Sequence, residues 1–175
     1  MHNKEFRRYK VAVAGDAGSG KTSLIYRLIG HPDITLVEKT KGVYIETLTN
    51  KNIELIFWDF SGQKHFREAI LPFFRGSHIV VLVFDLSNPQ SLVNLVKEWS
   101  IYVKNALNDV PCIVIGNKKD IKTLPDDFIE ASLEEMQKTI NVREYLEVSA
   151  MTGEGLEKFL EVLYNIAEEL RSKGI

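Results

Sequence analysis

Apolar runs and amphipathic stretches alternate along the whole chain. Runs typical of strands occupy residues 9–14, 42–49, 52–58, 79–85, 111–116 and 144–148. Helical spacing of apolar residues occupies 21–29, 65–74, 90–107, 128–140 and 155–170. The final stretch repeats its apolar positions at i, i+3, i+4 and i+7, which predicts a helix with one face on a sheet. The chain contains no internal repeat or low-complexity tract that would mark a domain boundary.

This order of elements predicts an α/β fold with six strands in a mostly parallel sheet and helices on both faces. The exception is the link at 49–52, which is too short to hold a crossover helix. The strands on either side of it are therefore expected to form an antiparallel hairpin at one edge of the sheet. Ligands of such sheets bind beyond the C-terminal ends of the strands, so the site is expected there.

Composition narrows the class of protein. The chain has 175 residues, of which 45% are hydrophobic and 26% charged, which indicates a single domain over 1–175. Its net charge of -2 argues against nucleic acid as a partner. The one cysteine, Cys112, lies in an apolar run, which favours a buried core residue and a reducing compartment. No run is long enough to span a membrane and no signal segment precedes the first strand, so a cytoplasmic protein is expected.

A glycine-rich loop follows the first predicted strand and precedes the first predicted helix. Residues 15–22 read Gly-Asp-Ala-Gly-Ser-Gly-Lys-Thr, which is the pattern of a loop that wraps the phosphates of a nucleoside triphosphate. Backbone N–H groups at a helix N-terminus bind the anion, Lys21 adds positive charge and the Thr22 hydroxyl binds Mg²⁺. The residues expected to contact the nucleotide here are Asp16, Ala17, Gly18, Ser19, Gly20, Lys21, Thr22 and Ser23.

Further polar groups follow the third predicted strand. Asp59 stands at its end, and a carboxylate here would hold Mg²⁺ through water. Gly62 can bring its N–H close to a terminal phosphate because it has no side chain. Gln63, the next residue, is placed to orient a water molecule.

Two loops after the fifth and sixth predicted strands carry the chemistry of base recognition. Asp120, in the sequence Asn117-Lys118-Lys119-Asp120, can accept from both the ring N–H and the exocyclic amino group of guanine. Adenine lacks this pair of donors. In Ser149-Ala150-Met151, the N–H of Ala150 can donate to the guanine carbonyl group.

Together these four segments resemble the small GTPases of the Ras superfamily, in the family's order and spacing and over the whole chain. The resemblance implies a P-loop NTPase three-layer sandwich, a Lys118 stem packed over the base, and a first-switch threonine that reaches Mg²⁺. Thr35 and Thr40 both lie in the right window, and Thr40 fits better because Thr40-Lys41-Gly42 leads into the second strand. The signals are Rab- or Ras-like with Arf-like spacing between the switches, and a prokaryotic or archaeal-type member fits them.

The resemblance implies a switch that hydrolyses GTP to GDP with Mg²⁺, using Gln63 and Lys21 as catalytic residues. It also implies an exchange factor, an activating protein and effectors that bind the switch loops. No encoded lipid anchor is expected, because His2 stands where myristoylation needs glycine and the last residues lack cysteine. Membrane association is expected to be at most weak or mediated by a partner. Ala17 and Lys64 depart from the family and motivate an alternative, a guanine-nucleotide-binding interaction module with negligible hydrolysis. An ATP-dependent phosphotransferase is a second alternative, against which Asp120 argues.

Overall fold

In the part of the chain that the computed structural model describes, residues 6–31 and 42–175, six strands form one sheet in the order β2-β3-β1-β4-β5-β6. The strands are β1 (Arg7–Ala14), β2 (Val43–Asn50), β3 (Ile53–Phe60), β4 (Ile79–Asp85), β5 (Cys112–Asn117) and β6 (Val142–Glu147). All neighbouring pairs are parallel except β2 with β3. The predicted six-stranded α/β sheet with one antiparallel edge strand is therefore confirmed.

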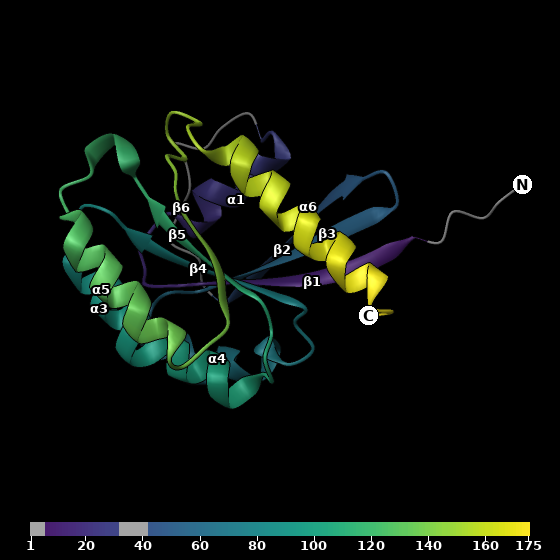
Figure 1. Ribbon diagram of the computed structural model, residues 1–175, viewed down its shortest axis with the longest axis horizontal. Coiled ribbons are helices and arrows are strands. Elements are labelled where there is room, and N and C mark those ends of the chain that lie inside the picture. The colour runs from purple at the N-terminus through teal and green to yellow at the C-terminus, as the bar shows by residue number, and fades with distance from the viewer. Residues whose placement is uncertain (1–5, 32–41) are drawn as a thin grey trace, which may run out of the picture.

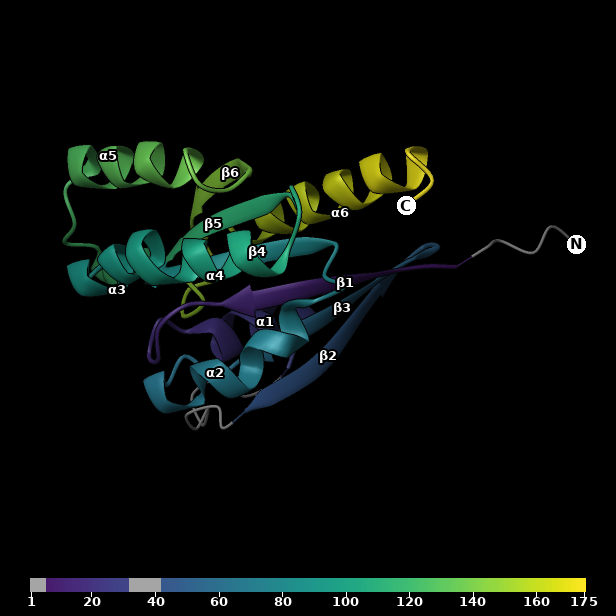
Figure 2. The same cartoon turned by 90° about the horizontal axis from the view of Figure 1, so that it is seen from below.

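Helices cover both faces of the sheet (Figure 1). They are α1 (Lys21–Ile29), α2 (Arg67–Ile70), α3 (Pro89–Asn94), α4 (Ser100–Ala106), α5 (Asp126–Gln137) and α6 (Leu156–Ser172). Helices α1 and α6 pack on one face, whereas α2, α3, α4 and α5 pack on the other. Figure 2 shows the same arrangement after a quarter turn, with β2 and β3 at one edge of the sheet.

Alternate residues of the central strands supply the two cores. In β4, Ile79, Val81 and Val83 face α1 and α6, whereas Val80, Leu82 and Phe84 face the opposite helices. Successive side chains of a strand point to opposite faces, so a strand covered on both faces must be apolar throughout. This explains why β4 is an uninterrupted apolar run with every residue buried.

The edge hairpin pairs Val43 with Phe60 at its open end and Asn50 with Ile53 at its turn. Lys51 in the turn adopts a left-handed φ of 54°, as tight hairpin turns require. The short link between these strands thus determines their antiparallel direction.

Two predicted helices are less regular than their apolar spacing suggested. The stretch 65–74 is divided into two 3₁₀ segments, η1 (Lys64–Phe66) and η2 (Leu71–Phe74), with the single turn α2 between them. The stretch 90–107 is helical as far as Ala106, but a π-helical turn, η3 (Leu95–Trp99), lies between α3 and α4. Both irregular segments lie next to the loop that follows β1.

Among the described residues, no helix combines the length and the apolar character that crossing a bilayer would need. Cys112 is fully buried in β5, as its apolar run predicted. Burial raises the pKa of its thiol to about 12.

Candidate nucleotide-binding site

The site lies at the C-terminal ends of the parallel strands, where the loop between β1 and α1 meets the loops after β3, β5 and β6. This edge is where ligands of open α/β sheets bind. Hydrogen bonds and close backbone contacts among these loops join all four predicted segments.

The loop after β1 is held in a tight curve by hydrogen bonds to its own backbone. Lys21 Nζ donates to the Asp16 carbonyl oxygen at 2.9 Å, and Ser19 N donates to the same oxygen at 3.2 Å. Gly20 adopts a left-handed φ of 89° before the first turn of α1, and a Cβ there would lie 2.3 Å from Asn117 Nδ2. The loop thus presents the N-terminus of a nine-residue helix, a site that favours anions.

Lys21 is the buried cation of this loop, at 5% exposure. Burial lowers its pKa to about 8, although the carboxylates of Asp59 and Asp16 act in the opposite direction. A lysine buried to this degree favours an anionic partner, because a positive charge removed from water needs a negative charge nearby to compensate for its lost hydration.

The two described oxygen ligands predicted for Mg²⁺ lie side by side. Thr22 Oγ1 donates a short hydrogen bond to Asp59 Oδ2, and Asp59 is 2% exposed at the end of β3. One hydroxyl and one carboxylate suit Mg²⁺, which takes few protein oxygens and completes its octahedron with phosphate and water. The described residues contain no group of three or more His, Cys, Asp or Glu side chains suited to a metal. Thr40, the third predicted ligand, lies outside the described residues.

The segment after β3 packs directly on the phosphate loop. A Cβ at Gly62 would lie 2.2 Å from Ala17 N and 2.3 Å from the Asp16 carbonyl carbon. Only glycine permits this approach of two backbones. Gln63 follows at once, and its N–H donates to Ser61 Oγ at 3.3 Å.

Asn117 connects the phosphate loop to the loop after β6. Its Nδ2 donates to the Ser19 carbonyl oxygen at 2.9 Å, and its Oδ1 accepts from Ala150 N at 3.1 Å. The residue is 1% exposed. Both ends of the buried amide are therefore satisfied, and the two loops are held at a fixed separation.

The predicted base-recognition residues also lie together. Ser149 Oγ donates to Asp120 Oδ1 at 2.5 Å and accepts from Thr152 N at 3.1 Å. The second oxygen of the exposed Asp120 carboxylate, Oδ2, takes no part in this hydrogen bond with Ser149. Met151 is 62% exposed, and its carbonyl oxygen accepts from Arg27 Nη2 at 3.2 Å.

Lys118 has a partner that the sequence did not indicate. Its backbone adopts a left-handed φ of 65°, and its Nζ donates to Asp85 Oδ2 at 2.7 Å. Burial alone would raise the pKa of Asp85, but hydrogen bonds from Lys118 and Ser87 outweigh it and lower that pKa. Asp85 thus directs the lysine side chain from the end of β4.

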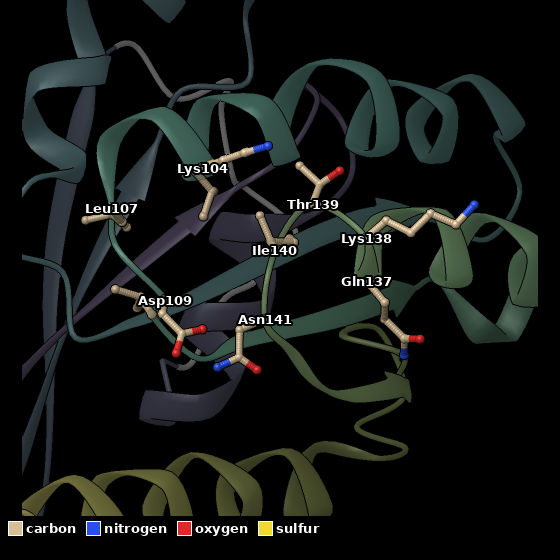
Figure 3. A pocket seen from close by; sticks show the side chains of 10 residues that line it. Lys104, Leu107, Asp109, Gln137, Lys138, Thr139, Ile140 and Asn141 are labelled. Carbon is tan, nitrogen blue, oxygen red and sulfur yellow. The ribbon is translucent and has the colours of Figure 1, made fainter.

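A cavity of about 470 Å³ lies elsewhere, between the ends of α4 and α5 (Figure 3). Its lining includes Lys104, Asp109 and Asn141. Asp109 and Asn141 precede β5 and β6, and Lys104 lies in α4, so the cavity is at the opposite edge of the sheet from the phosphate loop.

Comparison with known proteins agrees with this geometry. Residues 10–170 match the Ras family. The chain belongs to the Ras family. It is 34% identical over 170 residues to the Ras-related protein Rab-4 of Dictyostelium discoideum, covering 93% of this chain and 81% of that protein. It is 30% identical to the Ras-related protein RabL of the same organism, covering 92% and 82%, and 31% identical to the Ras-related protein Rab-1 of Theileria parva, covering 94% and 75%.

As a member of this family, the chain is a small GTP-binding switch protein that hydrolyses GTP. The predicted superfamily, fold and GTPase activity are thereby confirmed. Family membership also implies binding of GTP and GDP and interaction with regulators and effectors.

Proposed function

We propose that residues 1–175 form one G domain, whose four loops at the C-terminal sheet edge make a single guanine nucleotide site that uses Mg²⁺. The observation that carries this proposal is the position of Asn117, which joins the phosphate loop through Ser19 to the base loop through Ala150. A ligand with phosphates at one end and a purine at the other suits such an arrangement.

The roles of the residues follow from their positions. Lys21 and the N–H groups of residues 16–23 bind the phosphates, and Asp120 reads guanine. The Ala150 N–H, which donates to Asn117 Oδ1 in this structure, would donate to the guanine carbonyl group when the nucleotide is bound. Thr22 and Asp59, with Thr40 from outside the described residues, would hold Mg²⁺, which when bound neutralises negative charge on the phosphate oxygens.

Hydrolysis in this proposal is a matter of positioning and electrostatics. Gln63 orients the attacking water, while Lys21 stabilises the charge that develops on the terminal phosphate. Ordering of the loops by Thr40 and Gly62 in the triphosphate state, and their release after hydrolysis, would give the switch its output. Cytoplasmic function is part of the proposal, supported by the buried lone cysteine in a chain of this kind.

The surface around Trp58, beside the segment that follows β3, is suited to protein partners. Ile45 pairs with Trp58 across β2 and β3, Ile45 and Phe73 are 52% and 45% exposed, and the ring of Phe73 lies 6.2 Å from that of the half-buried Trp58. Exposed apolar side chains gathered on one face mark a protein interface. We therefore place regulators or effectors with an apolar contact face here.

Base recognition is tested by comparing GDP with inosine diphosphate, which lacks the exocyclic amino group. The natural chain should bind inosine diphosphate about 10- to 100-fold more weakly by calorimetry, because one oxygen of Asp120 loses its donor. In Asp120→Asn the amide nitrogen faces the amino group of guanine, so this preference should vanish or reverse. Asp109→Asn, at the opposite edge of the sheet, should keep it. An unchanged preference in Asp120→Asn would contradict the assignment.

The role of Gln63 is tested by single-turnover GTP hydrolysis in Mg²⁺. Gln63→Leu should hydrolyse at least tenfold more slowly than the natural chain and bind GTP with similar affinity, because leucine cannot orient water. Gln137→Leu, the same substitution at an exposed residue of α5, should keep the natural rate. Equal rates for Gln63→Leu and the natural chain would overturn the role.

A further inference from the structure

The carboxylate of Asp16, in the phosphate loop, is surrounded by donors from other elements. Oδ1 accepts from Arg67 Nη2 at 2.8 Å and from Trp99 Nε1 at 2.9 Å, and Oδ2 accepts from Asn94 Nδ2 at 2.5 Å. Arg67 belongs to α2, immediately after the segment that carries Gln63, whereas Asn94 precedes the π-helical turn and Trp99 is its last residue. We call Asp16, Arg67, Asn94 and Trp99 the Asp16 cluster.

Arg67 is fixed in this cluster from several directions. It is 6% exposed, and its guanidinium carbon lies 4.8 Å from the centre of the Trp99 ring. Its second terminal nitrogen pairs with Glu98. A buried, planar guanidinium that is paired on both terminal nitrogens and stacked on an aromatic ring has one available position.

The cluster fixes one end of the Gln63 segment, and Gly62 fixes the other. Gly62 contacts the backbone of Asp16 and Ala17, and Arg67 contacts the side chain of Asp16. Residues 63–66 therefore span two anchor points on the same stretch of the phosphate loop. The hydrogen bond from Phe66 N to the Gln63 carbonyl oxygen, at 3.0 Å, closes the turn between these two points.

We propose that Arg67, held on the Asp16 carboxylate, is a positioning residue that sets the orientation of Gln63 toward the attacking water. The inference rests on the role proposed for Gln63. Arg67 does not contact the nucleotide in this scheme. It fixes the position of the C-terminal end of residues 63–66, and so the direction that this short segment takes. Displacing a catalytic group by about an ångström lowers rates by up to about 10²-fold, so the anchor is expected to matter for rate more than for affinity.

The test is a cycle of single-turnover GTP hydrolysis in Mg²⁺. Arg67→Lys keeps the charge but cannot form the two-pronged contact with Asp16 and Glu98, so its rate should fall roughly tenfold. Its affinities for GTP and GDP, by calorimetry, should stay within about twofold of the natural chain. Arg75→Lys, an exposed arginine in the same region, should hydrolyse at the natural rate.

The double variant Gln63→Leu/Arg67→Lys separates positioning from general support. If Arg67 acts through Gln63, the double variant should hydrolyse within about twofold of Gln63→Leu alone. A purely structural role would make the two effects multiply, which would overturn the inference. So would an Arg67→Lys rate equal to that of the natural chain.

If circular dichroism shows that Arg67→Lys does not fold, Asp16→Asn takes its place. Asparagine keeps the shape of the aspartate side chain but removes the charge that holds Arg67. The same cycle of rates then applies, with no criterion of unchanged affinity, because Asp16 lies in the phosphate loop itself. If Gln63→Leu hydrolyses at the natural rate, the role of Gln63 and this inference both fail; if Gln63→Leu is slow but the anchor variants are not, only this inference fails.

Discussion

Single polar side chains connect the loops of the nucleotide site. Asn117 illustrates this best, because its buried amide satisfies a carbonyl oxygen of one loop and an N–H of another. Asp85, at the end of β4, likewise connects two segments, because its carboxylate accepts from Lys118 Nζ in the loop after β5. The loops after β1, β5 and β6 are therefore positioned by contacts within the chain itself, and a ligand has little ordering left to impose on these three loops.

Gly62→Ala is expected to destabilise the protein by about 1–3 kcal/mol, because the added methyl meets backbone atoms of Ala17 and Asp16 that cannot rotate away. Gly116→Ala is the matched control. Its methyl would contact side-chain atoms of Leu86 and Tyr145 at 2.9–3.0 Å, which can adjust, so its loss should be smaller. Urea unfolding measures both. A loss at Gly116 equal to or larger than that at Gly62 would contradict this account.

Motif residues could be predicted from the sequence, but their side-chain partners could not. Asn117, Asp120 and Lys21 lie in short local patterns that imply a chemical role. The contacts of Asp16 with Arg67 and Trp99 join positions 51 and 83 residues apart, and no local pattern records them. Only the proximity of an arginine to Gln63 in the sequence could have drawn attention to this cluster.

At the scale of elements, strands were predicted more accurately than the helix expected over 65–74. Buried strands are continuous apolar runs, whose position is clear from the sequence. The stretch 65–74 has helical spacing, but Pro72 within it lacks an N–H and ends the regular α pattern, so 3₁₀ turns replace it. The π-helical turn at Leu95–Trp99 was not predictable, because its extra residue leaves the apolar spacing nearly intact.

Strand β1 is joined to the residue before β4 by a pH-sensitive contact. Lys10 N donates to His78 Nδ1 at 2.9 Å, and His78 N donates to the Lys10 carbonyl oxygen at 2.9 Å. Burial, with a smaller effect from the Lys10 ammonium, lowers the pKa of His78 below its ordinary value of about 6.5. The unfolded chain therefore takes up a proton first as the pH falls below that value.

The free energy of unfolding should accordingly decrease as the pH falls from 7.5 to 5.5, because protonation of His78 favours the unfolded chain. In His78→Asn, whose side-chain oxygen can still accept from Lys10 N, this decrease should be smaller. Urea unfolding at both pH values measures it, with His65→Asn as an exposed control that should behave like the natural chain. An identical pH dependence in His78→Asn would show that His78 is not the source.

At the scale of the whole molecule, the sheet separates two apolar cores, and the site lies where loops from several strands converge. The mostly parallel sheet and its antiparallel edge could be predicted, because crossover handedness and link length leave few alternatives. The order β2-β3-β1-β4-β5-β6 came from the structure. The exact convergence of the loops depends on both cores packing correctly. Folding and assembly of the nucleotide site are therefore expected to be one event.

Nucleotide binding should stabilise the entire protein. With Mg²⁺ and GDP at 100 times the dissociation constant, the free energy of unfolding should rise by about 2.7 kcal/mol, and at 1,000 times by about 4.1 kcal/mol. ADP at the same concentrations should have no effect, because Asp120 finds no pair of donors on adenine. Denaturant unfolding at each concentration measures this. Equal stabilisation by ADP would argue against guanine selectivity.

The position of Cys112 offers a natural probe of opening. It is the only cysteine of the chain, it is fully buried in β5, and its thiol has a pKa of about 12. A thiol reagent can therefore react only when β5 becomes exposed to solvent, and the labelling rate counts those excursions without any engineered reporter. Slower labelling in the presence of GDP would reveal how far ligand binding restrains the centre of the sheet.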